Sequence, residues 1–82
     1  YIETDAKGEL LLCVNDDSPG RLAAVTSKIA ELEINIADMA LGRDKGQGTA
    51  MCALHLDDTL SDEGLEAVRL IEGFHWARVI RR

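Results

Sequence analysis

The chain changes abruptly from a strand pattern to a helix pattern around Pro19-Gly20, and this break most constrains the fold. Residues 10–14 form an unbroken apolar run, which is typical of a central strand covered on one or both faces. Pro19 fixes its own φ at about −65° and suits a first helical turn, which Asp17 or Ser18 could cap. The apolar residues that follow lie three or four positions apart and predict a helix with one buried stripe: Leu22, Val25, Ile29 and Leu32.

The rest of the chain continues this alternation of strands and helices. Residues 34–42 predict a second strand, and the polar stretch 43–48, with two glycines, predicts a hairpin into a third strand over 49–56. Strict alternation in that third strand places one set of side chains on each face: Ala50, Cys52, Leu54 and Leu56 on one, Met51, Ala53 and His55 on the other. Ser61 is expected to cap a second helix that ends at Gly73, and residues 74–80 predict the last strand.

The predicted order is therefore strand, helix, strand, strand, helix, strand. This order is the ferredoxin-like α+β arrangement, βαββαβ, with a four-stranded antiparallel sheet. Right-handed crossovers would place both helices on one face of the sheet and leave the other face uncovered. Trp76, Arg78 and Ile80 share one strand phase, so we expect some of them to line the uncovered face or an edge used in self-association.

The length of 82 residues predicts one domain with a thin core. We expect residues 1–8 to form a linker or tail and residues 9–82 to form the folded domain. The chain begins at Tyr1 rather than at Met, so we expect it to be part of a longer polypeptide.

Charge and cysteine content exclude several classes of function. A net charge of −6 argues against nucleic acid, because binding to the phosphate backbone needs clustered Lys and Arg. No apolar run approaches the roughly 20 residues of a membrane-spanning helix. Cys13 and Cys52 lie inside separate apolar runs without metal-ligand spacing, which predicts buried free thiols in a reducing, cytoplasmic compartment. A disulfide between neighbouring strands is the alternative.

The chain shows no convergent set of nucleophile, base and charge stabiliser. His55 and His75 have no Cys or Ser partner at a recognisable spacing. The pairs Asp16-Asp17 and Asp57-Asp58 each precede a helix, where capping explains them without a metal. We therefore predict no catalytic residue, no metal and no cofactor in this domain.

Two polar clusters bracket the first helix and are the candidate binding residues. Asp17 could accept hydrogen bonds from an α-ammonium group, the amides of Asn15 and Asn35 could contact a carboxylate or hydroxyl, and the helix start at Pro19-Gly20 could hold a carboxylate. The clusters lie at opposite ends of the helix, which favours a ligand shared between two chains of a side-by-side dimer. In the alternative interpretation, Asp17 is a helix cap and Asn35 a turn residue.

Residues 10–80 resemble an ACT domain, the small-molecule regulatory module of amino-acid metabolism. The resemblance rests on Asn15-x-Asp17-x-Pro19-Gly20, on Asn35-Ile36-Ala37 and on Leu41-Gly42-Arg43. Within that family the chain is most similar to the C-terminal regulatory domain of phosphoglycerate dehydrogenase, and the related domain of iron–sulfur L-serine dehydratase is the near rival.

This resemblance implies side-by-side pairing of two copies into an eight-stranded sheet, with L-serine or another small amino acid at the interface. It implies effector-binding roles for six residues: Asn15, Asp17, Pro19, Gly20, Asn35 and Ile36. Asn15 is the weakest of these assignments, because the first loop position varies within the family. The parent chain would be an enzyme of L-serine biosynthesis such as phosphoglycerate dehydrogenase; the alternatives are the dehydratase, or a ligand-free dimerisation module.

Overall fold

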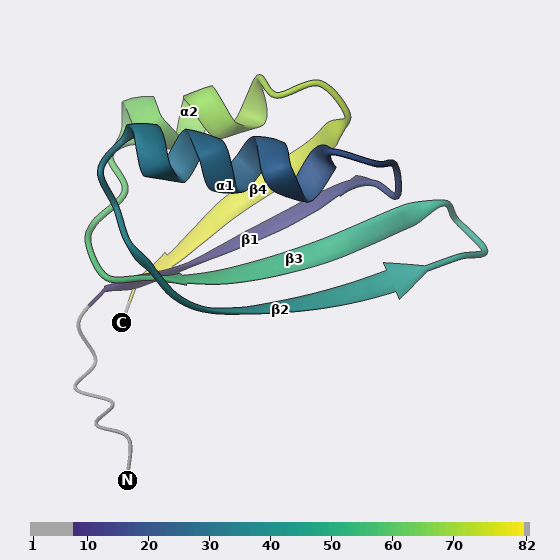
Figure 1. The fold of residues 1–82 in the computed structure, drawn as a ribbon, viewed down its shortest axis with the longest axis horizontal. Coiled ribbons are helices and arrows are strands. Elements are labelled where there is room, and N and C mark those ends of the chain that lie inside the picture. Colours follow the sequence, from purple (N-terminus) through teal and green to yellow (C-terminus); the bar gives the residue numbers. More distant parts are fainter. Residues whose placement is uncertain (1–7, 82) are drawn as a thin grey trace, which may run out of the picture.

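The computed structural model describes residues 8–81 and has the predicted ferredoxin-like α+β fold (Figure 1). The elements in chain order are β1 (Glu9–Asp16), α1 (Arg21–Glu31), β2 (Ile36–Asp44), β3 (Thr49–Leu56), α2 (Asp62–Arg69) and β4 (Phe74–Arg81). The strands form one antiparallel sheet in the order β2-β3-β1-β4, and both helices lie on the same face of it (Figure 1). The predicted linker over residues 1–8 lies, apart from Gly8, outside the described residues.

The core lies between the sheet and the two helices. Alternate residues of β1 point at the helices, and Leu11 and Cys13 are fully buried there. Val25 and Ile29 of α1 and Val68 of α2 pack on them from above. The alternation predicted for β3 is confirmed, because Ala50, Cys52, Leu54 and Leu56 are buried while Met51 is exposed. Neither helix in residues 8–81 is long and apolar enough to cross a membrane.

The start of α1 and the end of α2 differ from the sequence prediction. Neither Asp17 nor Ser18 caps α1: the N-cap residue is Gly20, which has a φ of 87° and gives no side-chain hydrogen bond. Gly73 does not end α2, which stops at Arg69, and its φ of 89° instead serves the turn into β4. Ser61 does cap α2 as predicted, since its Oγ accepts a hydrogen bond from the Gly64 N–H at 3.0 Å.

Strand β2 begins and ends two residues later than predicted. It covers Ile36–Asp44 instead of 34–42, because Arg43 and Asp44 still pair with Ala50 and Thr49 of β3. Antiparallel partners project their side chains to the same face of a sheet. Arg43 therefore belongs to β2 and not to the predicted hairpin turn. It lies on the helix side of the sheet, next to the buried Ala50.

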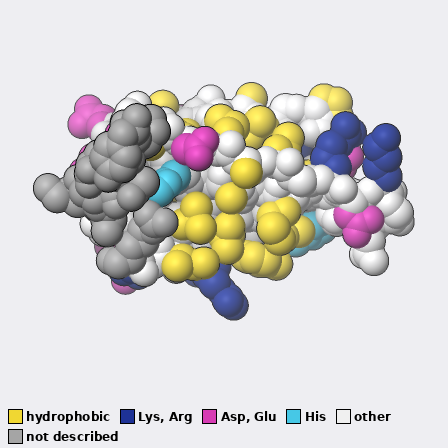
Figure 2. Space-filling view, turned by 90° about the horizontal axis from the view of Figure 1, so that it is seen from below, with side chains coloured by type: hydrophobic (Ala, Val, Ile, Leu, Met, Phe, Trp, Pro, Cys, Tyr) yellow, Lys and Arg dark blue, Asp and Glu magenta, His cyan; other side chains and the backbone are white. Residues whose placement is uncertain are grey.

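The sheet face opposite the helices is uncovered, as the sequence predicts, and apolar side chains gather on it (Figure 2). Trp76, Ile80 and Met51 are exposed. A second exposed apolar group lies on the helix side of the edge strand β2, where Met39 and Leu41 pair with Leu54 and Cys52. Met39 is 46% and Leu41 53% exposed, because neither helix extends far enough to cover them.

Cys13 and Cys52 lie directly opposite each other on β1 and β3, and both are free and buried, as predicted. Burial, with a smaller contribution from the charge of Cys52, raises the pKa of Cys13 from 9.0 to about 12. Burial also raises the pKa of Cys52. Both shifts favour the neutral thiol in the folded state, and the thiolate is the reactive form.

We expect both thiols to resist iodoacetamide at pH 8 in the native protein and to react rapidly in denaturant, as measured by mass spectrometry of timed, quenched samples. The unfolded thiols ionise first, so the free energy of unfolding should fall as the pH rises from 9.0 toward about 12. Native labelling at the rate of the denatured sample would contradict this assignment.

Candidate functional site

The loop between β1 and α1 is held by backbone hydrogen bonds to two other turns at the same end of the sheet. The Asp16 N–H donates to the carbonyl of Gly73 at 2.8 Å, and the Asp17 N–H donates to the carbonyl of Gly48 at 2.9 Å. Gly20 then takes the left-handed conformation that turns the chain into α1. The loop therefore has a defined shape although its helix start lacks a side-chain cap.

Asn15 sits at the buried edge of this loop, on the helix side of the sheet. Its side chain is almost completely buried, and its Nδ2 donates to the carbonyl of Asp16 at 2.8 Å. The pairing of β1 with β4 shifts register between Val14 and Asn15, which marks a β-bulge in this ladder, while β1 stays paired with β3 through Asp16. Asn15 thus supports the loop from below, in addition to lining a pocket above it.

Asp17 is paired with a residue that the sequence placed in a hairpin turn. Nε of Arg43 donates to Oδ2 of Asp17 at 3.0 Å, which joins the β1–α1 loop to the end of β2. The side chain of Asp17 is 23% exposed and that of Arg43 is 57% exposed. Arg43 is not among the site residues predicted from the sequence, although it belongs to the Leu41-Gly42-Arg43 motif and shares its i, i+2 phase with Met39 and Leu41.

The β1–α1 loop and β2 enclose a pocket of about 190 Å³ on the helix side of the sheet. Its lining includes three of the predicted site residues, Asn15, Asp17 and Gly20, together with Leu41 and Arg43. Pro19 lies in the same loop, fully on the surface, and is not among the lining residues. The volume is below the range of about 300–1,000 Å³ that is typical of drug-sized ligands, so the pocket suits a very small molecule.

Asn35 and Ile36 lie at the far end of β2 from this pocket. Nδ2 of Asn35 donates to Oδ2 of Asp57 at 2.8 Å, and the Asp57 N–H donates to the Asn35 carbonyl at 2.9 Å. Ile36 pairs with Leu56. A strand of this length spans roughly 25–30 Å, so one chain does not bring Asn35 and Asp17 together.

The acidic pairs serve other contacts than the predicted helix caps. Oδ1 of Asp16 lies 2.9 Å from Nε2 of His75, and its Oδ2 lies 3.9 Å from Nη2 of Arg21. Asp57 accepts from Asn35, as described above, while Ser61 caps α2. Within residues 8–81, no group of three or more His, Cys, Asp or Glu side chains is placed to hold a metal ion.

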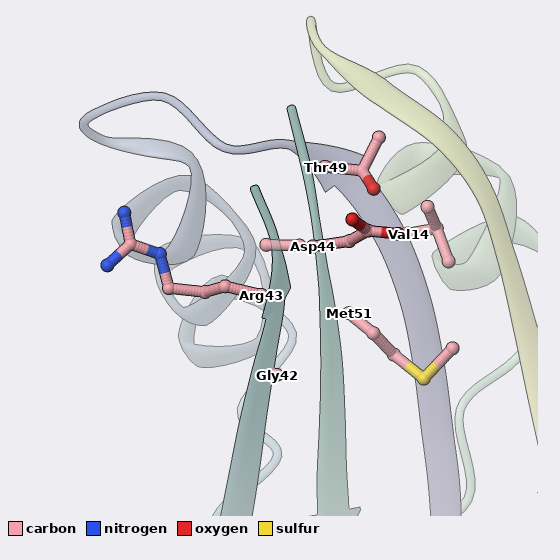
Figure 3. A pocket seen from close by; sticks show the side chains of 7 residues that line it. Val14, Gly42, Arg43, Asp44, Thr49 and Met51 are labelled. Atoms are coloured by element: carbon pink, nitrogen blue, oxygen red, sulfur yellow. The ribbon is translucent and has the colours of Figure 1, made fainter. Parts of the chain in front are cut away.

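A larger pocket of about 320 Å³ lies at the same end of the sheet, where β1, β2 and β3 meet (Figure 3). The side chain of Arg43 extends to the opposite side from those of Asp44 and Met51 (Figure 3). Oδ1 of Asp44 already accepts from the N–H groups of Gly46 and Gln47, at 3.1 and 3.3 Å. None of the predicted site residues lines the larger pocket, whereas three line the smaller one, so the smaller one is the better candidate site.

Comparison with known proteins identifies the domain type. The family model of the ACT domain matches residues 9–71. The chain is 32% identical over 72 residues to a D-3-phosphoglycerate dehydrogenase of Synechocystis sp., covering 88% of this chain and 13% of that protein. It is 31% identical over 74 residues to a D-3-phosphoglycerate dehydrogenase of Methanocaldococcus jannaschii, covering 90% of this chain and 14% of that protein. The chain thus spans about one seventh of the curated relatives it matches.

Solved structures support the same fold. The ACT domain from GTP pyrophosphokinase of Chlorobium tepidum superposes with a TM-score of 0.72 at 18% identity, over 90% of this chain and 97% of that one. The prephenate dehydratase of Staphylococcus aureus gives 0.71 at 20% identity, over 90% of this chain and 30% of that one. At these identities the likeness concerns the fold alone.

The loop conformation at Gly20 can be tested against Gly42, since a methyl group would meet open space at both positions. Only Gly20 has a positive φ, so Gly20→Ala should lower the free energy of unfolding by about 1–2 kcal/mol. Gly42→Ala should be neutral or stabilising by up to about 1 kcal/mol. Urea denaturation at one protein concentration measures both, and equal effects would contradict the left-handed conformation of Gly20.

Proposed function

Because this chain belongs to the ACT domain family, we propose that it is the effector-binding regulatory domain of an enzyme of L-serine biosynthesis, a phosphoglycerate dehydrogenase, and that it binds L-serine between two copies. The pocket beside the β1–α1 loop carries the proposal, because it joins a carboxylate, an amide and a helix start in a small volume. Both curated relatives described above are D-3-phosphoglycerate dehydrogenases, which supports that parent enzyme. The free, buried thiols agree with a cytoplasmic protein.

The chemistry of the pocket fits a small amino acid. The carboxylate of Asp17 can accept hydrogen bonds from an α-ammonium group, and the loop that leads into α1 can receive a carboxylate near the positive end of the helix dipole. Leu22 and Leu41 close the apolar side of the pocket and limit the size of the ligand side chain. The domain itself acts by binding, and catalysis belongs to other parts of the parent enzyme.

The edge strand β2 supplies the geometry for a shared site. It is an edge of the four-stranded sheet in residues 8–81, and its middle residue is Ala40. If two β2 strands pair antiparallel about Ala40, Ile36 of one copy lies opposite Asp44 of the other. Asn35 of the second copy then lies beside the pocket that contains Asp17, so the proposed dimer unites residues that one chain keeps apart.

The bound effector would act by favouring one arrangement of the attached catalytic domains. Coupling of this kind needs a ligand that binds one arrangement more tightly than the other. A site shared between two copies meets this need, because its affinity for the ligand depends on how the two copies are placed. A ligand-free assembly module is the second candidate function. One observation favours it: Asp17 and Asn35 already have protein partners, Arg43 and Asp57.

The proposed β2 interface can be tested at Met39, which is exposed on the edge strand but does not line the pocket. Met39→Glu places a charge in the interface and should weaken dimerisation by at least about tenfold in analytical ultracentrifugation. Leu70→Glu is the matched control, since Leu70 is 83% exposed and lies at the end of α2. Equal dimer affinities for the two variants would remove β2 from the interface.

Calorimetry with L-serine tests the ligand. Wild type should bind L-serine, and Asn35→Ala should weaken binding by at least about tenfold, because a polar group of the ligand loses its partner. Glu31→Ala should bind like wild type. No heat at millimolar L-serine, with a dimer confirmed, would favour the ligand-free assembly module.

Mixing two variants that do not bind L-serine tests whether two copies share each binding site. A homodimer of Asp17→Ala and a homodimer of Asn35→Ala should each lack L-serine binding at both of their sites. A heterodimer of the two has one site with both wild-type side chains, so an equal mixture should recover about a quarter of the wild-type binding sites. No recovery after subunit exchange would show that Asp17 and Asn35 of different copies do not form one site.

A further inference from the structure

We propose that Arg43 is the carboxylate-binding residue of the effector site and that it restricts the ligand to free α-amino acids. In the structure Nε of Arg43 donates to Asp17; on ligand binding this ion pair opens, the α-ammonium group binds Asp17 and the α-carboxylate binds Arg43. The inference rests on the proposed function and names the chemistry by which that site recognises its ligand.

The first support is the position of Arg43. It is the penultimate residue of β2 and pairs with the buried Ala50, so its side chain leaves the sheet on the helix side. From there it reaches the β1–α1 loop, and both it and Asp17 line the 190 Å³ pocket. Figure 3 shows the guanidinium extending away from the larger pocket that Met51 lines.

The second support is a conflict over Asp17. Its carboxylate is the group in the pocket best suited to an α-ammonium group, yet one oxygen already accepts from Arg43 at 3.0 Å. A ligand cation must therefore displace the guanidinium or share the carboxylate with it. The displaced guanidinium would face the ligand. A ligand carboxylate suits it, because the two oxygens can accept two parallel hydrogen bonds from the planar guanidinium.

The ion pair can open at little cost. The side chain of Arg43 is 57% exposed and Asp17 also touches solvent, and ion pairs in such settings contribute little to stability. Arg43 can swing without uncovering the core, since it lies on an edge strand. The two side chains thus offer one negative and one positive partner, which match the ammonium and carboxylate groups of an amino-acid zwitterion.

Arg21 is the other cation that lines the pocket, and its Nε is buried without a hydrogen-bond partner, but the side chain is confined where it lies. It lies against Gly73, where an added Cβ would collide with it, and its Nη2 faces Asp16 at 3.9 Å. Its side chain is only 24% exposed, so it has less freedom than Arg43. Asp16 in turn faces His75. Among the pocket residues, Arg43 is therefore the cation with the greater freedom to turn toward a ligand.

The test compares ligands that lack one charge. L-serinamide has no carboxylate, and 3-hydroxypropionate has no ammonium group. Wild type should bind L-serine at least about tenfold more tightly than either compound, by calorimetry. Arg43→Gln should lose about tenfold in L-serine affinity and leave L-serinamide affinity nearly unchanged, so that this variant no longer discriminates between them. Arg43→Lys keeps the charge without the planar fork and should fall between the two.

Arg78→Gln is the matched control, because it removes one exposed guanidinium from β4, on the sheet face opposite the pocket. It should bind and discriminate like wild type, and unfolding of all variants without ligand verifies that they fold. If Arg43→Gln binds L-serine as tightly as wild type, or keeps the preference over L-serinamide, the role of Arg43 is wrong and the proposed function stands. If wild type itself binds no amino acid, the proposed function and this inference both fail.

Discussion

Two backbone hydrogen bonds, from Asp16 to Gly73 and from Asp17 to Gly48, hold three turns together at one end of the sheet. These bonds anchor the residues that lead into α1, whose start has no side-chain cap. They also bring the β1–α1 loop against the end of β2, so that Asp17 meets Arg43. The pocket is therefore a consequence of how the turns meet, and its walls come from segments far apart in the sequence.

The edge strand β2 sets the second constraint. A chain of 82 residues has a thin core, and two helices of 11 and 8 residues leave Met39 and Leu41 uncovered on the helix side of that edge. An edge strand with exposed apolar side chains is a template for pairing. Covering Met39 and Leu41 by a second copy would stabilise the domain and, in the same step, bring Asn35 of that copy to the pocket.

Much of the fold could be predicted from local patterns, because each pattern acts over a few residues. The alternation over residues 49–56 assigned the two faces of β3, and Ser61 capped α2 as its sequence context indicates. The errors arose where local and long-range partners compete for one side chain. Asp17 has the sequence position of a helix cap, but its carboxylate pairs with Arg43, which is 26 residues away.

Arg43 itself escaped prediction for a related reason. Its neighbours are polar and precede two glycines, which indicates a turn, whereas pairing with Ala50 keeps it in the strand. Strand ends depend on register, and register is fixed by tertiary contacts that a single sequence does not display. The separation of Asn15 and Asp17 from Asn35, in contrast, followed from topology alone, because the two ends of one helix lie at opposite ends of the sheet.

In the proposed dimer, the hydrogen-bond partners of Asp17 and Asn35 have a direct consequence for regulation. Asp17 is paired with Arg43, and Asn35 donates to Asp57 while its amide oxygen can still accept. A ligand between two copies would exchange the first pair for contacts of its own and would add a bridge to Asn35 of the second copy. Thermodynamic linkage then requires the ligand to strengthen the pairing of β2 strands by the same factor by which pairing strengthens ligand binding. The gain in effector affinity on dimerisation and the gain in dimer affinity on effector binding would therefore measure the same coupling free energy. A substitution in the pocket or at the edge of β2 would alter both gains.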